Sequence, residues 1–583
     1  MKHLITCLFA IVALFGSCSP SSDTAVPSVP TGIESSSVTE NSFIVTWKAS
    51  SGAKSYDWKL EEGSDEKKSG SRTSPYVQID GLEAGHSYLF AVRACNGEAV
   101  SAWSKSLSVT TSGSSQSDPT SLCVDSPLLL QLNSAPELGA QGFIKVFDSS
   151  DNQVDAINLA DLETVSVRDD GQMIPKTRMT GTTTLNTFMD VVPCGPYWRV
   201  VHYTPLRLRS NALEIKLHSG VLDYGREYYV TMDAGFVKNH AGLAKGDWTF
   251  TTKAAPSSAS GLNVNSDGSA DFCTIPGALI HAASKGRNDN VVINVASGTY
   301  NEMPCLREKN NVSIRGANRE TTVIAYANSE AYESGSGSSV DVKPTVGQAI
   351  DPKNSKNTGG RGVMLFENCD NLSFENLTMR NTFGSRDGQA EVIYFNSGNN
   401  THRLTIENCA LYSLQDTFLC KGRVWVHNSL IAGHCDYIWG YPELCLFEDC
   451  EIRSEYDGYI VQARTAQTAK GFVFLNCRLT AGEKASNNTV YLARANNHDN
   501  ETAKTYDNVV FVNCRMSPVI RRTGWLDSPA PLPASPSATS GWREYGSMDL
   551  SGNALDLSGR STFGKVLTAE EAVPYLTREA VMN

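Results

Sequence analysis

The sequence predicts an all-β protein in which a right-handed parallel β-helix follows two β-sandwich domains. In residues 255–583 an alternating apolar strand recurs and ends in Asn or Asp, at Asn376, Asn408, Asn428, Asp449, Asn476 and Asn513. The spacings are 32, 20, 21, 27 and 37 residues. A minimum of about twenty residues with a variable excess is typical of a solenoid with loops inserted on one side. Before residue 255, short strands separated by turn residues indicate sandwiches.

The first 18 residues have the pattern of an export signal. The apolar run 4–15 is about a dozen residues long, which is too short to span a bilayer. Two small residues then precede Cys18, which resembles a bacterial lipoprotein processing site with Cys18 as the lipidated residue; plain secretion is the alternative. Residues 19–26 are rich in Ser and Pro and predict a linker. We therefore expect an exported outer-membrane lipoprotein, at the cell surface or in the periplasm.

Residues 27–111 alternate in the manner of a half-buried sandwich. Phe43–Trp47 is a strand, and Leu82 precedes Tyr88 just before another strand. This Leu-x5-Tyr phrase resembles the tyrosine corner of a fibronectin type III domain. The segment contains no catalytic constellation, so a spacer is favoured over a carbohydrate contact. The Ser-rich residues 112–119 predict a second linker.

Residues 120–254 are again rich in strands and resemble a bacterial Ig-like domain, most clearly in Tyr228–Met232 and Trp248–Thr252. We assign no chemistry to this segment. The pattern then changes, because Ile275–Ala283 is apolar without strand alternation. This stretch predicts a helix that covers the open end of the β-helix in residues 255–583.

Charge and cysteine usage restrict the possible partners and cofactors. The net charge of −12 argues against nucleic acid or an anionic membrane surface as the main partner. Five cysteines follow the Asn or Asp at a strand end, and we expect them to be small buried residues: Cys369, Cys409, Cys450, Cys477 and Cys514. The Cys and His spacings do not resemble a zinc site. We predict neither a metal nor a cofactor.

Two aspartates carry the chemical hypothesis. Asp416 and Asp436 lie twenty residues apart, each eight residues after an Asn. Stacked coils would put them on one face about 4.8 Å apart, where repulsion raises one pKa and leaves one carboxyl protonated. Such a pair can supply the nucleophile and the proton donor for ester hydrolysis. An Asp at a solenoid turn is more often structural, and Asp457 has the same phase without a catalytic motif.

Several motifs resemble, in order, those of the pectin methylesterase family: Gly298–Glu302, Gln389–Glu391, Gln415–Phe418, Asp436–Gly440, Gln462–Thr465 and Leu492–Arg494. The resemblance implies a carbohydrate esterase on a parallel β-helix. Its reaction would hydrolyse methyl esters of galacturonic acid residues in pectin, with release of methanol and pectate. The implied partner is a pectic polysaccharide, either methyl-esterified homogalacturonan or a decorated pectin, bound by a monomer without a cofactor.

The resemblance also implies the role of each residue. Asp436 would be the nucleophile that forms an acyl-enzyme, and Asp416 would protonate methanol and then deprotonate water. The side-chain amides of Gln389 and Gln415 would hold the oxyanion. Arg494 would pair with Asp436 and keep it ionised.

Four further residues are predicted to bind the sugar chain: Phe418, Tyr437, Trp439 and Arg464. Aromatic faces suit the apolar faces of pyranose rings, although core packing is the alternative for the aromatic residues and a solvated charge for the Arg. The family's Pro-Trp after the Arg is replaced by Ala495 and Asn496. Together with the polar excursion 329–361, this departure predicts a remodelled cleft that accepts a decorated pectin.

Two other classes of function fit the same fold. A pectic lyase would need clustered carboxylates for calcium and a basic residue, and a glycosidase would use paired acids without the amides. The presence of Gln389 and Gln415 favours the ester hydrolase. A non-catalytic surface glycan-binding protein is the third possibility, because sandwich modules are typical of such proteins.

Overall fold

The computed structural model describes residues 26–583 except 37, 39–41, 64, 84–85, 98, 112–120, 160–164, 168–172, 176–182, 185–188, 259, 331–332, 334, 336, 338, 342, 344–348, 351–358, 387 and 497–503. The predicted export signal with Cys18 and most of both predicted linkers lie outside the described residues. Among those described, no helix is both long enough and apolar enough to cross a membrane. The chain divides into two compact units, residues 1–115 and 116–583.

The first unit contains the predicted N-terminal sandwich. One antiparallel sheet consists of β1 (Thr31–Ser36), β2 (Ser42–Lys48) and β5 (Tyr76–Asp80). The other consists of β3 (Ser55–Glu62), β4 (Asp65–Arg72), β6 (Ser87–Asn96), β7 (Ala99–Val100) and β8 (Leu107–Thr110). Trp47 and Phe90 pack in the core between them. The Tyr88 hydroxyl accepts a hydrogen bond from the Glu83 N–H at 2.9 Å, which is the contact expected of a tyrosine corner.

The segment 120–254 folds around a core of its own. One sheet has the order β10-β19-β18, and the other has the order β12-β11-β20-β21-β9. Their bounds are β9 (Ser121–Leu122), β10 (Leu128–Gln131), β11 (Phe143–Asp148), β12 (Gln153–Asn158), β18 (Leu206–Leu208), β19 (Ala212–Ile215), β20 (Glu227–Met232) and β21 (Thr249–Thr252). Three short ladders add β13 (Val165–Val167) with β14 (Met173–Pro175), β15 (Thr183–Thr184) with β28 (Ala349–Ile350), and β16 (Met189–Pro193) with β17 (Trp198–His202). The assignment of this segment to the Ig-like class stays a prediction.

This segment packs against the β-helix rather than standing apart from it, since residues 116–583 form one unit. Arg199 in β17 is completely buried and donates hydrogen bonds to the carbonyls of Gly359 and Val363, both at 3.0 Å. The Asp125 carboxylate accepts from the N–H and the hydroxyl of Thr274, at 2.7 and 2.6 Å. The contacts of Arg199 satisfy buried polar groups that would otherwise lack partners.

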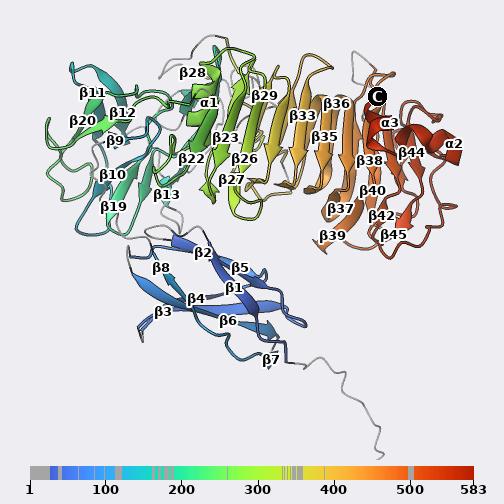
Figure 1. The fold of residues 1–583 in the computed structure, drawn as a ribbon, viewed down its shortest axis with the longest axis horizontal. Coiled ribbons are helices and arrows are strands. Elements are labelled where there is room, and N and C mark those ends of the chain that lie inside the picture. Colours follow the sequence, from blue (N-terminus) through green and yellow to red (C-terminus); the bar gives the residue numbers. More distant parts are fainter. Residues whose placement is uncertain are drawn as a thin grey trace, which may run out of the picture. The chain divides into compact units, whose positions relative to one another are not determined.

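The predicted parallel β-helix is confirmed. Its strands pair in parallel from β22 to β46, and Figure 1 shows them stacked side by side from green to red. Each complete coil contributes strands to three faces. The first face contains β22 (Gly261–Val264), β23 (Val291–Val295), β26 (Val312–Gly316), β30 (Leu372–Glu375), β33 (Arg403–Glu407), the ends of β35 (Phe418–His427) and β36 (Leu430–Glu448), β38 (Gly471–Leu475), β41 (Val509–Val512), β44 (Trp542–Tyr545) and β46 (Gly564–Val566).

The other two faces follow in the same order along each coil. The second contains β24 (Gly298–Tyr300), β27 (Thr322–Tyr326), β31 (Thr378–Asn381), β34 (Ala410–Tyr412), the starts of β36 and β37 (Glu451–Ala463), β39 (Arg478–Lys484), β42 (Arg515–Met516) and β45 (Met548–Asp549). The third contains β25 (Cys305–Arg307), β29 (Met364–Glu367), β32 (Ile393–Asn396), the start of β35, the middle of β36, the end of β37, β40 (Val490–Arg494) and β43 (Trp525–Leu526).

Equivalent residues stack on one another inside the coil. The rings of Phe447, Phe474 and Phe511 are parallel to within 9°, with centroids 4.8 and 4.3 Å apart. The five predicted strand-end cysteines are buried, and each thiol donates to the carbonyl two residues before it. They therefore fill the interior as small residues, as the sequence indicated.

The recurring Asn or Asp turns each coil from the first face to the second. All six have positive φ, between 47° and 56°: Asn376, Asn408, Asn428, Asp449, Asn476 and Asn513. Asn and Asp tolerate this left-handed conformation better than other non-glycine residues, because their short side chains form local hydrogen bonds. The Asn408 Nδ2 group donates to Asn376 Oδ1 at 2.8 Å, which continues the column from coil to coil.

Helices lie at both ends of the β-helix. The predicted first helix is α1 (Ile275–Ala283), and Thr274 caps it by accepting from the Gly277 N–H at 3.0 Å. At the other end, α2 (Ala569–Ala572), the 3₁₀ helix η3 (Val573–Tyr575) and α3 (Arg578–Met582) pack over a separate apolar cluster that includes Leu444 and Val510.

Candidate active site

Asp416 and Asp436 occupy the same corner of two successive coils, between the second and third faces. The backbone of Gln415 pairs with that of Gln389 on one side and that of Cys435 on the other. The two aspartates are therefore one strand spacing apart, about 4.8 Å at the backbone. Both have positive φ, 64° and 48°, and both side chains are buried. Two such backbone conformations with buried carboxylates are typical of a functional site.

Asp436 is surrounded by hydrogen-bond donors. Arg494 in β40 donates hydrogen bonds to both carboxylate oxygens, from Nε to Oδ1 at 2.7 Å and from Nη2 to Oδ2. Gln462 in β37 donates from Nε2 to Oδ2 at 3.0 Å, and the Arg464 Nε atom holds the amide oxygen of Gln462 at 2.9 Å. A bidentate Arg and an amide donor fix the orientation of this carboxylate.

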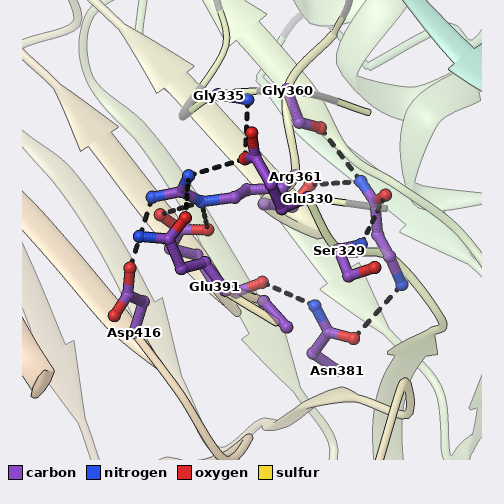
Figure 2. A network of polar contacts seen from close by, with 12 residues as sticks. Ser329, Glu330, Gly335, Gly360, Arg361, Asn381, Glu391 and Asp416 are labelled. Carbon is purple, nitrogen blue, oxygen red and sulfur yellow. Dashed lines mark hydrogen bonds and ion pairs between the residues drawn. The ribbon is translucent and has the colours of Figure 1, made fainter. Parts of the chain in front are cut away.

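Asp416 faces a second arginine, Arg361, which comes from the end of the predicted excursion 329–361 (Figure 2). The Arg361 Nη2 atom lies 3.2 Å from Asp416 Oδ2, and Nε lies 3.0 and 2.9 Å from the two carboxylate oxygens of Glu391. Its Nη1 atom donates to Glu330 and to the amide oxygen of Gln389, both at 2.7 Å. The guanidinium therefore contacts three carboxylates and one amide.

These surroundings favour the protonated form of Asp416. Burial raises the pKa of Asp416 well above its usual range, and the nearby carboxylate of Glu391 raises it further. Arg361 opposes this increase, Asp436 adds to it and Arg464 opposes it. Burial also raises the pKa of Glu391, again against the effect of Arg361. Asp416 can consequently donate a proton at a pH where an ordinary aspartate has lost it.

Two amide groups beside the aspartates are available to a ligand. The amide oxygen of Gln389 accepts a hydrogen bond from Arg361. No described residue accepts a hydrogen bond from the Nε2 atom of Gln389. The Gln415 side chain is half-buried and makes no hydrogen bond to any residue that the structure describes. Amide donors of this kind can stabilise an oxyanion next to a nucleophile.

Comparison with known families agrees with this geometry. A model of the pectinesterase family matches residues 261–577, which is more than half of the chain. The chain belongs to the pectinesterase family. It is therefore a carboxylic ester hydrolase, and its reaction is the hydrolysis of methyl esters in pectin. A fibronectin type III model matches residues 28–110 and confirms the predicted N-terminal domain.

Similar proteins carry the same family name. Pectinesterase 14 of Arabidopsis thaliana is 27% identical over 322 residues, which cover 54% of this chain and 84% of that protein. The pectinesterase of Ralstonia solanacearum is 26% identical over 250 residues, which cover 40% of this chain and 62% of that one. The solved pectin methylesterase PemA of Erwinia chrysanthemi has a TM-score of 0.43 and 23% identity, over 56% of this chain and 98% of its own.

The prediction that Phe418 and Tyr437 bind the sugar chain is wrong. In this pectinesterase Phe418 and Tyr437 are completely buried, so neither ring can meet a sugar. Phe418 packs against Phe447 with the ring centroids 6.3 Å apart, and the Tyr437 hydroxyl lies 3.0 Å from that of Ser454. The prediction relied on the position of both residues just after an Asp in the sequence, but closeness in sequence does not decide whether a side chain points into the coil or out of it.

Of the other two predicted residues, Trp439 is also buried, whereas Arg464 is partly exposed. Trp439 is only 6% exposed, and the Arg464 guanidinium lies 5.0 Å from the centroid of its ring. The exposed aromatic residue is Tyr441, whose hydroxyl accepts from Arg464 Nη1 at 3.0 Å. Lys421 lies 5.6 Å from the ring of Tyr441, so this part of the pectinesterase carries two cations beside an exposed ring.

Sequence reasoning missed three residues that contact the aspartates directly or through one side chain: Arg361, Glu391 and Gln462. Glu391 had a local signal, since it is a single charge between apolar residues just before strand β32. Gln462 belongs to the motif Gln462–Thr465, but the resemblance assigned no role to it. No sequence pattern linked Arg361 to Asp416, because the excursion that brings it there has no periodicity.

A second cluster of candidate ligands lies away from the aspartates. Among the described residues, the ligand atoms of Cys123, Asp125 and Cys273 lie within 4.8 Å of one another. The Asp125 carboxylate already accepts from Cys273 and Thr274, and the Lys253 ammonium lies 3.4 Å from the Cys123 thiol. These contacts explain the cluster as a set of hydrogen bonds that links the segment 120–254 to the start of α1.

Proposed function

We propose that this pectinesterase hydrolyses methyl galacturonate residues through an acyl-enzyme on Asp436. The observation that carries the proposal is the difference between the two aspartates, since Asp436 is held by donors and Asp416 is buried with a raised pKa. Where the surroundings give two neighbouring carboxyls different proton affinities, one can act as the nucleophile and the other as the acid.

In the first step an ionised oxygen of Asp436 attacks the ester carbon. The carbonyl oxygen becomes an oxyanion that accepts hydrogen bonds from the amides of Gln389 and Gln415. The bond from carbon to the methoxy oxygen then breaks, and Asp416 gives its proton to this oxygen. Methanol leaves, and the galacturonate carbonyl remains joined to Asp436 as a mixed anhydride.

In the second step water attacks the galacturonate carbonyl of the anhydride. The ionised Asp416 takes a proton from the water, which returns Asp416 to its starting state. The bond to Asp436 breaks, and Asp436 leaves as a carboxylate held by Arg494. The products are one free galacturonate and one methanol for each water consumed.

We propose that the sugar chain contacts the surface formed by Lys421, Tyr441 and Arg464, with Trp439 supporting Arg464. The two cations suit galacturonate carboxylates, and the exposed Tyr441 ring suits a pyranose face. The absence of the family's Pro-Trp after Arg494 supports a decorated pectin as the preferred substrate. Methanol release from plain and from acetylated or branched esterified pectin, compared at equal ester content, tests this preference.

We also propose that the chain acts as an exported monomer anchored through a lipid on Cys18. The apolar run followed by small residues and a cysteine supports this location. A Cys18→Ser variant is expected to leave the membrane fraction while keeping its specific activity. Retention of that variant in the membrane fraction would rule out a lipid on Cys18.

Methanol release from methyl-esterified polygalacturonate tests the function. The wild-type protein is expected to release methanol, and Asp436→Asn to lose at least about 1,000-fold in kcat while keeping its thermal unfolding midpoint. Asp457→Asn is the matched control, because Asp457 is exposed and its side chain bonds only to Ser486 and Thr489 among the residues that the structure describes. Wild-type protein without methanol release, or an active Asp436→Asn variant, would contradict the proposal.

A further inference from the structure

We propose that Arg361 and Glu391 are positioning residues that let Asp416 act first as an acid and then as a base. Neither residue touches the reacting ester in this account, and both act through Asp416. The inference rests on the proposed function, because it concerns the proton that Asp416 carries.

The charges around Arg361 do not balance if every carboxyl is ionised. One guanidinium contacts Glu330, Glu391 and Asp416, so three carboxylates share one positive charge. The side chains of Arg361, Glu391 and Asp416 are 7%, 0% and 5% exposed, whereas that of Glu330 is 39% exposed. Water cannot screen the excess negative charge in the buried part of the cluster, so the cluster retains a proton.

Arg361 and Glu391 act on Asp416 in opposite directions. After Asp416 protonates methanol, it must remain as a buried anion until water attacks. The guanidinium at 3.2 Å compensates this anion, while Glu391 prevents the compensation from becoming so strong that Asp416 cannot hold its proton beforehand. The pair thus sets a proton affinity that serves both half-reactions.

The same guanidinium orients an oxyanion donor. Arg361 Nη1 donates to the amide oxygen of Gln389 at 2.7 Å, so the Nε2 hydrogens of Gln389 point away from Arg361. One arginine from a distant part of the chain therefore fixes both the proton carrier and one amide. This link explains why an excursion of about thirty residues ends at a buried position.

The charged groups that face Asp416 come from several coils. Besides Arg361 and Glu391 they are Asp436 on the next coil and Arg464 on the coil after that. The neighbouring Cys435 thiol stays neutral, because burial raises its pKa to about 12. Changing Arg361 or Glu391 alone leaves the other charged groups in place. The charge that is removed therefore decides whether the pKa of Asp416 rises or falls.

The pH dependence of kcat/KM for methanol release tests the inference. Glu391→Gln keeps the shape and removes a negative charge, so the alkaline limb is expected to move about one pH unit lower. Arg361→Met removes the positive charge, so the limb is expected to move about one unit higher, with a lower kcat because Asp416 becomes a weaker acid for the departing methanol. The double variant is expected to return the limb to within about half a unit of wild type.

Two further variants separate this role from a purely structural one. Arg361→Lys retains the charge and is expected to keep the wild-type limb, which provides a rescue if Arg361→Met folds poorly. Glu544→Gln is the matched control, since Glu544 forms a buried ion pair with Arg560 at 2.7 Å on other coils. It is expected to lower the unfolding midpoint without moving the limb.

The outcomes distinguish this inference from the proposed function. Wild-type protein that releases no methanol would overturn the function itself. An active wild type, with limbs of Glu391→Gln and Arg361→Met that stay in place or move in the same direction, would overturn only the role of Arg361 and Glu391.

Discussion

Asp416 and Asp436 share a backbone position but differ in what surrounds their carboxyl groups. Asp436 receives three hydrogen bonds from Arg494 and Gln462. Asp416 is desolvated and, within the part of the chain that the structure describes, receives one longer contact, from Arg361. The chemistry of the pair therefore depends on three side chains from other coils as much as on the two aspartates.

Arg494 should be sensitive to a change that keeps its charge. Arg494→Lys loses the fork that holds both oxygens of Asp436, and we expect kcat/KM for methanol release to fall about 10- to 100-fold. Arg521→Lys is the control, because Arg521 lies 4.6 Å from the ring of Tyr491 on a neighbouring coil and has no contact with Asp436 among the described residues. Equal activity of the two variants would argue against a role for the fork.

At the residue scale the sequence predicted the positions that follow motifs and missed those that do not. The two aspartates and Gln389, Gln415 and Arg494 lie together because motif order follows coil order. The buried rings of Phe418 and Tyr437 could not be predicted from their closeness in sequence to the two aspartates. Arg361 could not be predicted at all, since its partner lies 55 residues away without a periodic relation.

The repeated corner is the element that the sequence predicted best. Each Asn or Asp at the end of the strand phrase adopts positive φ, so the residue type reports the backbone conformation directly. The lengths of the inserted loops were predicted only as excess spacing. Their contacts depend on side chains that carry no repeat.

Asn428 provides a test of the corner. Its φ is 47° and its side chain is exposed, so Asn428→Ala should destabilise the fold by about 1–2 kcal/mol through backbone strain. Asn428→Gly should be close to wild type, because glycine adopts this conformation freely. Urea unfolding followed by circular dichroism measures both, and equal destabilisation would show that the side chain matters more than the backbone.

Glu302, which bonds to the start of α1, should make the stability of the fold depend on pH. Glu302 accepts from the Ile275 N–H at 2.9 Å, and burial raises its pKa from 4.5 to about 8. Between these values the folded chain holds a proton that the unfolded chain has lost, so unfolding free energy falls as pH rises, by at most about 5 kcal/mol. Glu302→Gln keeps the acceptor and should lose this decline when unfolding midpoints are compared from pH 5 to pH 8. A decline equal to that of wild type would mean that Glu302 does not cause it.

At the scale of the whole molecule, the two predicted sandwiches belong to different compact units. The fibronectin type III domain forms a unit of its own, whereas segment 120–254 shares a unit with the β-helix. Sequence patterning predicted both sandwiches but not this difference. The contacts of Arg199 with β-helix carbonyls are made by side chain and backbone groups that leave no periodic signal.

Removal of the first 111 residues tests this division. We expect the shortened chain to fold and to release methanol from soluble esterified pectin within about twofold of the wild-type rate. Arg199→Met in the full chain, by contrast, should lower the unfolding midpoint, because it leaves several buried carbonyls without donors. Loss of activity on removal of residues 1–111 would show that the first unit takes part in catalysis.

The roles of the two aspartates are tested most directly with an Asp416→Asn variant and an aryl ester of galacturonate, whose leaving group needs no proton. We expect a rapid burst of one phenol per protein, followed by slow turnover because no base activates water. We also expect a galacturonyl adduct on the peptide that contains Asp436. A variant that shows no burst, or that carries its adduct on a residue other than Asp436, would contradict the assignment of the two aspartates.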